Sequence, residues 1–406
     1  MKENNNNGFY WPSTYNEEPS YPALTENESC DVLVVGGGMT GALCAYTLSK
    51  DTDLDVVMID RQKIAQGNIP ANNGMVKFSS DRMLHELMRD IGTDAAVYFY
   101  EMCQDAVKKL GSLALDLNMG NDYRIRNSLY FASSDEDAVK IAKEYEALHH
   151  YGFPVHFIKE KNISNYVPFH KPAALLTEGD ADMNPFRFVQ EIVNCAVNHG
   201  ARVYEETPLL HKSKGSDYFI IDTGRAIIRA KHLLFATGYD NDFLAQQFGA
   251  SLHRSYAVIT EPLPAIKGWN DKCMIWETNR PYLYMRTTAD SRIIAGGMDE
   301  NSPDEPFDAL MLQQKADRLL AKINELFPDV KPVLAHAWET TLGDSHDGLP
   351  YIGEHPNNEG EYYCLGFGGN RTVYSMIGAE MIKELLTHGS HPAQKLFSLA
   401  RVPVLQ

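Results

Sequence analysis

Three glycines and one carboxylate near the start of the chain have the types and the spacing to hold a phosphate and a ribose. An apolar run leads into Gly36-Gly-Gly38-Met-Thr-Gly41, and a second apolar run ends at Asp60, nineteen residues beyond Gly41. Gly36 permits a sharp turn, Gly38 lets backbone N–H groups approach a pyrophosphate, and Gly41 lets a helix lie close to the sheet. A carboxylate at the position of Asp60 accepts hydrogen bonds from a ribose. The pattern predicts a dinucleotide-binding unit, whereas a plain glycine-rich turn would leave the placing of Asp60 to chance.

A second group of side chains with possible chemistry lies in Tyr282-Leu-Tyr284-Met-Arg286. Alternate residues of a strand share one face, so we expect the two phenols and the guanidinium side by side. Together they suit a polar or anionic group of a substrate. A solvated strand face is the alternative interpretation.

Metal chemistry is not predicted. The six cysteines are scattered, with no Cys-x-x-Cys spacing that would suggest zinc or a redox pair. We expect most of them to be buried, reduced thiols. The adjacent His149 and His150 are expected at a solvated helix end.

Length and charge limit the class of protein. A chain of 406 residues, 44% of them apolar, exceeds the usual size of a single core, so two domains are expected. The net charge of −17 would repel nucleic acid and an anionic membrane surface. The first thirty residues are polar, unlike an apolar signal segment, and no stretch has the length of a membrane span. We therefore expect a cytoplasmic protein without a nucleic-acid or membrane partner.

The elements that must position these residues alternate between strand and helix. A helix is expected from Met39, and a polar loop at 67–74 follows the second strand, at the carboxyl side of the sheet where ligands of open α/β folds bind. Further strands are expected at 124–132, 202–205, 218–222, 226–230, 232–235 and 361–365, with several antiparallel strands between 256 and 297. Helices are expected at 79–117, 136–151, 186–198, 307–326 and 372–387.

Three motifs together resemble the FAD-dependent D-amino acid oxidase, glycine oxidase and sarcosine oxidase (DAO) family, including relatives that act on γ-glutamylputrescine. They are Gly36 to Asp60, Ala236-Thr237-Gly238 and Gly366-Phe-Gly-Gly-Asn370, and the resemblance spans nearly the whole chain. It implies an FAD-dependent oxidoreductase that oxidises the C–N bond of a small amine or amino acid by hydride transfer to flavin N5. Its electron acceptor would be O2 or another molecule.

The resemblance also assigns residues to the cofactor. The implied FAD-binding residues are Gly36, Gly38, Met39, Thr40, Gly41, Asp60, Arg61, Gly67, Asn72, Asn73, Gly74, Leu209, Thr237, Gly238, Gly366, Gly368, Gly369, Asn370, Arg371 and Thr372. The helix that follows Asn370 would aim its N-terminus at the flavin. The expected catalytic residues are Tyr282, Tyr284, Arg286, Trp338, Phe367 and Arg371. Among these, Trp338 and Phe367 would wall the flavin, unless they are simply core aromatics.

Several positions depart from the family pattern. Only three of the eight residues of 67–74 match the usual Gly-Ala-Ser-Gly-Arg-Asn-Gly-Gly. Leu342 stands where amino acid oxidases carry a carboxylate-binding arginine, which disfavours a simple α-amino acid unless Arg286 or Arg371 substitutes. Arg371 replaces a residue that is often glycine, and it either enters the site or turns to solvent. No cysteine lies where sarcosine oxidases attach their flavin, so we expect noncovalent FAD.

The predicted fold is α/β, with a discontinuous Rossmann-like FAD-binding domain and a second α+β substrate domain built on an antiparallel sheet. The expected bounds are 1–28 for an N-terminal arm, 29–78 with 184–245 and 346–406 for the FAD domain, and 79–183 with 246–345 for the substrate domain. Two other functions stay open. One is an NAD-dependent dehydrogenase, which would have no use for the two later motifs. The other is a flavoprotein subunit or FAD-binding protein with little turnover of its own.

Overall fold

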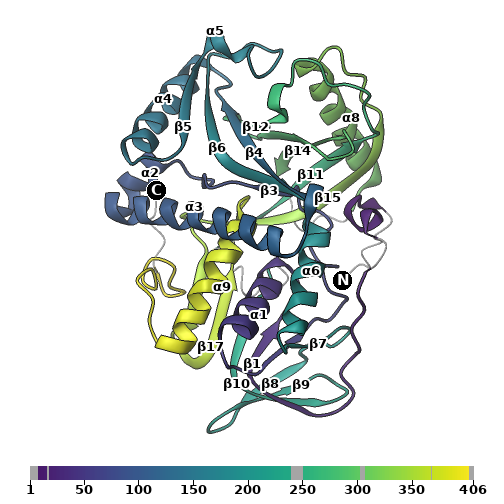
Figure 1. Ribbon diagram of the computed structural model, residues 1–406, viewed down its shortest axis with the longest axis vertical. Helices are drawn as coiled ribbons and strands as arrows, with labels where there is room; N and C mark the ends of the chain where they lie inside the picture. The colour runs from purple at the N-terminus through teal and green to yellow at the C-terminus, as the bar shows by residue number, and fades with distance from the viewer. Residues whose placement is uncertain (1–7, 16–17, 239–249, 302–306, 367, 402–406) are drawn as a thin grey trace.

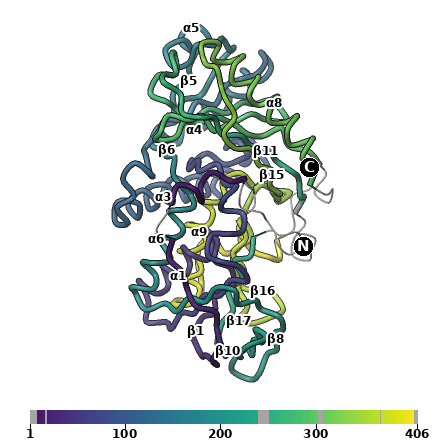
Figure 2. The backbone as a smooth tube through the Cα atoms, turned by 90° about the vertical axis from the view of Figure 1, so that its right-hand side faces the viewer, coloured from purple at the N-terminus to yellow at the C-terminus, as the bar shows by residue number. Residues whose placement is uncertain are grey.

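Two sheets, one in each half of the molecule, organise the fold (Figure 1). The structure is a computed structural model that describes residues 8–15, 18–238, 250–301, 307–366 and 368–401. A long helix, α3 (Thr93–Asp116), lies between the halves with α2 (Leu84–Ile91) before it. Figure 2 shows the same division from the side. This arrangement confirms the predicted fold class.

The first sheet carries the dinucleotide unit. Its strand order is β16-β17-β10-β1-β2-β7, parallel from β17 to β7, with β9 and then β8 joining β10 as an antiparallel extension. The strands are β1 (Glu28–Val35), β2 (Val56–Ile59), β7 (Arg202–Tyr204), β8 (His211–Lys214), β9 (Phe219–Asp222), β10 (Ile227–Phe235), β16 (Tyr351–His355) and β17 (Asn358–Leu365). Continuous apolar runs form the parallel strands because both of their faces are covered. The two strands expected at 226–230 and 232–235 are one strand, β10.

Three helices pack side by side on the first sheet. They are α1 (Met39–Asp51), α6 (Pro185–Asn198) and α9 (Arg371–His388). Pro185 suits the first turn of α6, where its missing N–H has no intrahelical partner to lose, and Asn184 caps the helix by accepting from the N–H of Arg187. Both α1 and α9 begin at the carboxyl ends of parallel strands, so their N-termini lie at one edge of the sheet.

The second sheet is antiparallel except where β4 pairs with β12. Its strands are β3 (Met75–Val76), β4 (Tyr123–Phe131), β5 (Val155–Lys159), β6 (Ala173–Met183), β11 (Ala250–Thr260), β12 (Met274–Glu277), β13 (Leu283–Thr287), β14 (Ile293–Glu300) and β15 (Leu334–Ser345). The remaining helices are α4 (Asp135–His150), α5 (Glu160–Ile163) and α8 (Ala309–Leu326), with short 3-10 turns at Trp11–Thr14, Gly120–Asp122 and Asn270–Lys272. The strand β3 lies inside the segment expected for the FAD domain, yet it pairs with β6 of this second sheet.

The described part of the N-terminal arm contacts both halves. Near its end, the N–H of Leu24 donates to the Thr207 hydroxyl at 3.0 Å, beside the first sheet. Near its start, the Tyr10 hydroxyl donates to the Asp290 carboxylate at 3.2 Å, in the connection after β13 of the second sheet. In Figure 2 the arm rises beside α6 between these two points. Among the described residues, no helix is both long enough and apolar enough to cross a bilayer.

Candidate active site

The glycine motif forms the expected strand–turn–helix, and two of its glycines meet different surroundings. A Cβ on Gly41 would lie 1.8 Å from the Gly36 carbonyl oxygen, so this position admits glycine alone. A Cβ on Gly38 would meet no atom within 4 Å among the described residues. No side chain there caps the N-terminus of α1, so its first N–H groups face open space. Thr40 of this first turn is joined to α9, with its hydroxyl 2.7 Å from that of Ser375.

Asp60 closes the second strand beside the glycine turn. Its carboxylate accepts from the N–H of Gly37 at 2.6 Å and from that of Gln62 at 2.7 Å. The carbonyl of Asp60 accepts from the N–H of Thr207 at 2.8 Å, which brings the segment that carries Leu209 next to the strand end. Arg61 follows directly in the chain. The ribose-side residues that the resemblance implies therefore lie together.

The Ala236-Thr237-Gly238 turn lies against the glycine motif. Its first N–H, that of Ala236, donates to the carbonyl of Val35 at 2.9 Å, and the Ala236 carbonyl faces Gly36. The Thr237 hydroxyl is buried and has no hydrogen-bond partner within the described ranges. A buried polar atom without a partner is costly, so this atom is a candidate ligand contact.

The start of α9 supplies the second part of the cofactor site. Gly366 follows the end of β17, Phe367 lies outside the described residues, and Gly368 and Gly369 precede Asn370, the residue directly before the helix. The Asn370 amide nitrogen donates to the carbonyl of Lys77 at 2.9 Å, while its side-chain oxygen is buried without a partner among the described atoms. Thr372 is buried in the first turn.

One contact at this helix differs from the expectation. The N–H of Gly369 donates to the Asp81 carboxylate at 2.6 Å. This N–H, one residue before Asn370, is therefore held by a carboxylate and does not face open space.

Together these features fit FAD. The uncapped start of α1 with open space at Gly38 suits a pyrophosphate, because helix N-termini present N–H groups and a positive pole to phosphate. The two unpartnered oxygens, on Thr237 and Asn370, lie in the two motifs on either side of the predicted cofactor path. The donor set is that of a dinucleotide site.

Four consecutive carbonyl groups of the loop 67–74 are each held by a donor from a distant part of the chain. The carbonyl of Ala71 accepts from the indole N–H of Trp338 at 3.2 Å, and that of Asn72 from the indole N–H of Trp11 at 2.8 Å. The carbonyl of Asn73 accepts from the guanidinium of Arg286, and that of Gly74 from the backbone N–H of Met183 at 2.8 Å. Within the loop, the Asn72 side chain accepts from the N–H of Gly74 at 2.7 Å. The loop, which starts at Gly67, is fixed over its second half.

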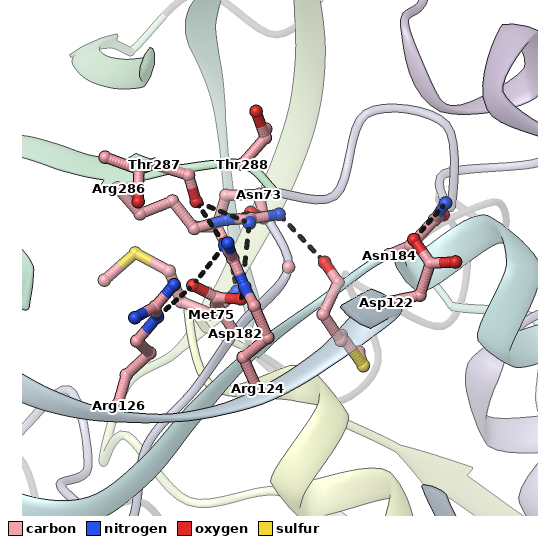
Figure 3. A network of polar contacts seen from close by, with 12 residues as sticks. Asn73, Met75, Asp122, Arg124, Arg126, Asp182, Asn184, Arg286, Thr287 and Thr288 are labelled. Atoms are coloured by element: carbon pink, nitrogen blue, oxygen red, sulfur yellow. Dashed lines mark hydrogen bonds and ion pairs between the residues drawn. The ribbon is translucent and has the colours of Figure 1, made fainter. Parts of the chain in front are cut away.

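Arg286 was expected to face a substrate beside Tyr282 and Tyr284, but its side chain lies elsewhere. Its side chain is 1% exposed and is absent from the cavity wall among the described residues, because the guanidinium bonds the carbonyls of Asn73 and Met183 (Figure 3). Arg124 and Arg126 converge on Asp182 on the other side, and the Asp182 carboxylate lies 3.9 Å from Arg286. Burial lowers the pKa of Arg286 to about 10, so it stays charged at neutral pH. Arg286 positions the loop and does not contact a substrate in the cavity.

Gly74 is required by the same contact. It has a φ of +70°, and a Cβ there would lie 2.4 Å from an Arg286 guanidinium nitrogen and 2.2 Å from the Met183 carbonyl oxygen. Only glycine lets the loop pass this close to the buried cation.

Trp338 is buried, in keeping with the second interpretation, that of a core aromatic. Its ring is 3% exposed, its N–H is used by Ala71, and Phe9 of the N-terminal arm lies against it with ring centroids 6.2 Å apart. It is not among the described residues of the cavity wall. The N-terminal arm and the loop therefore both contact Trp338.

A cavity of about 400 Å³ lies between the second sheet and the start of α9. Tyr282 and Tyr284 line it, as expected, together with Leu342, Gly368 and Gly369. The two phenol rings lie 6.1 Å apart. Burial raises the pKa of both phenols, so they are neutral hydrogen-bond donors at neutral pH. We refer to this space as the cavity.

Arg371, the first residue of α9, lies near the cavity without lining its described wall. Its charge acts on the Tyr284 phenol, whose pKa it lowers against the larger effect of burial.

Carboxylates line one part of the cavity, and the sequence did not indicate them. His253 lies between two of them, with one ring nitrogen 3.7 Å from Asp299 and the other 3.4 Å from Asp344. Burial raises the pKa of Asp299, an effect that the Ser255 hydroxyl and His253 oppose. Asp81 joins them, and the charges of all three acids act on Tyr282. This part of the cavity attracts cations.

Two further wall residues, Lys77 and Trp276, were also missed. They and the acids come from separate segments, so no local motif unites them. One local signal exists, because Asn73, Met75, Lys77 and Ser79 alternate along an extended segment and all line the cavity. The period of two from Asn73 onward would have pointed to Lys77.

Comparison with known proteins identifies the family of the chain. A family model described as FAD dependent oxidoreductase (DAO) matches residues 31–385. The chain is 25% identical over 97% of its length to YhfW of Bacillus subtilis (strain 168), provisionally named a Rieske 2Fe-2S iron–sulfur protein, and covers 75% of that protein. It is 24% identical to the gamma-glutamylputrescine oxidoreductase of Escherichia coli (strain K12), over 93% of this chain and 88% of the relative.

Solved structures share the fold. Glycine oxidase from Geobacillus kaustophilus matches with a TM-score of 0.79 at 20% identity, over 92% of this chain and 99% of the other. L-proline dehydrogenase from P. horikoshii matches with a TM-score of 0.78 at 19% identity, over 92% and 98%. Because the family model runs from the first strand to the last helix and includes all three motifs, the chain belongs to the FAD-dependent oxidoreductase (DAO) family of enzymes, whose cofactor is FAD.

Proposed function

We propose that the chain uses noncovalent FAD to oxidise the C–N bond of a small amine held in the cavity. Family membership supports the cofactor, and two structural neighbours carry the names of enzymes that act on glycine and on proline. FAD, when bound, would supply a two-electron acceptor: a neutral amine that gives up its α-hydrogen as hydride becomes an iminium ion, which water hydrolyses to a carbonyl compound and ammonium. We propose for the FAD and substrate domains the bounds expected from the sequence, except that β3 belongs with the second sheet.

The chain's own residues bind and orient the substrate. Tyr282 and Tyr284 offer neutral hydroxyl groups and aromatic faces to a substrate amine. Gly296 makes this possible for Tyr284, because a Cβ at 296 would lie 2.2 Å from the Tyr284 hydroxyl. Asp299 and Asp344 attract the ammonium form of the substrate into the cavity. Orientation over the cofactor can account for several kcal/mol of a barrier, about 7 or more in favourable cases.

Leu342 is the residue on which the preference for an amine over an α-amino acid rests. Its side chain lines the cavity and is 8% exposed, at the position where an arginine would bind an α-carboxylate. A carboxylate against this apolar wall loses water without gaining a cation, which costs on the order of several kcal/mol. Arg286 does not replace the missing arginine, because the loop carbonyls occupy it.

The test is the anaerobic reduction of the bound flavin by paired compounds, each α-amino acid against its decarboxylated amine. We expect the amine of each pair to bleach the flavin faster. Leu342→Arg should narrow or reverse the difference, and its flavin absorbance shows whether the variant still binds FAD. Faster reduction by the amino acids in the unaltered protein would contradict the proposal. Peroxide release on readmission of air, compared with dye reduction, then distinguishes O2 from another acceptor.

A further inference from the structure

Lys77 is one of the residues that line the cavity. It follows β3, and Asn73, Met75 and Ser79, at intervals of two, line the same wall. The intervening Val76 and Phe78 are buried, at 0% and 1% exposed. Side chains of an extended chain alternate between two faces, so the long side chain of Lys77 projects on the cavity side.

The ammonium group of Lys77 rests on an aromatic surface of the second sheet. Its Nζ lies 4.5 Å from the ring centroid of Trp276 in β12, and Trp276 stacks on Tyr130 of β4 with centroids 5.5 Å apart. The Lys77 carbonyl, in contrast, accepts from Asn370 at the start of α9. The backbone of Lys77 thus lies beside the start of α9, and its ammonium group lies at the second sheet.

Lys77 takes part in no ion pair within the described ranges. The charge of Lys77 acts on the carboxylate of Asp180, whose pKa burial raises and Lys77 partly lowers. Asp180 is 0% exposed, and its carboxylate accepts from the N–H of Phe78 at 2.9 Å and from the Thr177 hydroxyl at 2.7 Å. An aromatic face satisfies only part of an ammonium group, whose remaining donors point away from the ring.

Among the described residues of the cavity wall, Arg82 and Arg280 are also charged at all physiological pH values. Their contacts differ from those of Lys77. Arg82 forms an ion pair with Asp90. Arg280 lies 4.9 Å from the ring centroid of Tyr282, and its charge acts on Asp299 and Asp344. Of these three described wall cations, Lys77 is the one that forms no ion pair and is not among the charges acting on Asp299 and Asp344.

We propose that Lys77 binds a carboxylate of the substrate that is remote from the oxidised amine. This inference rests on the proposed amine oxidation and names the substrate class as ω-amino acids and similar amines with a distant acidic group. The ammonium group rests on Trp276 of the second sheet, whereas Gly368 and Gly369 belong to the segment before α9, so the two parts of the wall come from different halves of the molecule. Asp81, Asp299 and Asp344 would repel an anion elsewhere in the cavity, so the two ends of such a substrate meet opposite charges.

The experiment uses the FAD-loaded protein and ω-amino acids of three to five carbons, each paired with the n-alkylamine of the same length. Binding is measured under anaerobic conditions by the change in flavin absorbance before reduction, and the limiting rate of reduction is measured separately. Lys77→Met should weaken binding of the ω-amino acids by about tenfold or more, and it should change alkylamine binding by less than about threefold. Lys77→Arg should retain most of the preference.

Lys171 provides a matched control. Its Nζ lies 4.6 Å from the ring centroid of Phe131, a similar arrangement outside the described cavity wall, so Lys171→Met should leave both ligand series unchanged. Equal weakening of both series in Lys77→Met, or no preference for the ω-amino acids in the unaltered protein, overturns the assignment. If ω-amino acids bind with this preference but do not reduce the flavin, the assignment of Lys77 is supported and the proposed oxidation is overturned. If other amines reduce the flavin and ω-amino acids are not preferred, the oxidation is supported and the assignment of Lys77 is overturned.

Discussion

At the scale of single residues, Gly38 and Gly41 should respond differently to the same substitution. Gly38→Val adds atoms to space that is open among the described residues, so the variant should fold, but the added methyl groups should block the pyrophosphate. Gly41→Val forces a clash with the Gly36 carbonyl and should prevent folding. Soluble yield, circular dichroism and bound FAD per chain measure both effects. A Gly38→Val protein that purifies with full FAD would refute the role of this glycine.

Residue types in the cofactor motifs could be predicted because their chemistry depends on local spacing. The glycines at 36, 38 and 41 and the acid at 60 act through backbone geometry that the sequence itself determines. Arg286 shows the limit of this reasoning. Arg286 alternates with Tyr282 and Tyr284, as predicted. Alternation predicts which face of the strand a side chain shares, but not whether that part of the face lines a cavity or is covered by another segment. At Arg286 the loop covers it. The acids of the cavity wall come from separate segments and left no local signal.

At the scale of elements, the indole of Trp11 fastens the N-terminal arm to the loop. Trp11→Phe keeps an aromatic ring but removes the donor to Asn72, which leaves a part-buried carbonyl short of a partner, at a cost of about 1 to 2 kcal/mol. We expect a lower melting temperature and FAD binding weakened by about threefold to thirtyfold. Fluorescence titration of the apoprotein with FAD measures the dissociation constant.

Trp269→Phe is the control for this change. Trp269 is as buried as Trp11, at 4% exposed, and its N–H donates to the Cys273 carbonyl at the same 2.8 Å. Its ring stacks on Phe327, with centroids 4.6 Å apart, and its N–H does not bond the loop. It should lower the melting temperature by a similar amount and leave FAD binding unchanged. If both variants bind FAD equally well, the arm does not act through the loop.

Most long elements followed from their periodicity, and the failures have physical reasons. The helix expected at 307–326 is α8 with Asp308 as its cap, and the strand expected at 124–132 is β4 within one residue. The strand β6 was missed because Glu178 and Gly179 interrupt its apolar pattern where the strand reaches solvent. β3 was missed because two residues are too few to show a period, and its pairing with β6 is a tertiary effect.

At the scale of the whole molecule, an ion pair holds the connection between the two sheets. Asp347 lies between β15 of the second sheet and β16 of the first, and Arg401 binds its carboxylate at 2.6 and 2.9 Å. Arg401 also donates to the carbonyl of Leu349 at 2.7 Å, and its guanidinium carbon lies 3.5 Å from the ring centroid of Tyr351. Burial alone would raise the pKa of Asp347, but the bonds from Arg401 outweigh it and the net pKa is lowered.

This lowered pKa gives a pH dependence with a definite sign. The pair stabilises the folded chain above the unfolded pKa of an aspartate, about 3.9, and the contribution is lost as the pH falls through the lower folded value. Asp347→Asn should therefore cost on the order of 3 kcal/mol at pH 7, and its deficit in melting temperature should hold down to about pH 4 and shrink below it. Thermal melts of both proteins from pH 7 to pH 3 provide the comparison. A deficit that grows on acidification would exclude the assigned pair.

The four held carbonyls of residues 71–74 have a consequence for the order in which the chain assembles. Their donors come from the arm, from β13, from β15 and from the end of β6, at large and unequal separations along the sequence. Each contact of this kind closes a long stretch of chain and cannot form before the segments at both of its ends are in place. The unit from 31 to 60 needs only neighbouring residues and its own sheet. The glycine end of the cofactor site can therefore form by local folding, whereas the loop end must wait for the second sheet and for the first residues of the chain.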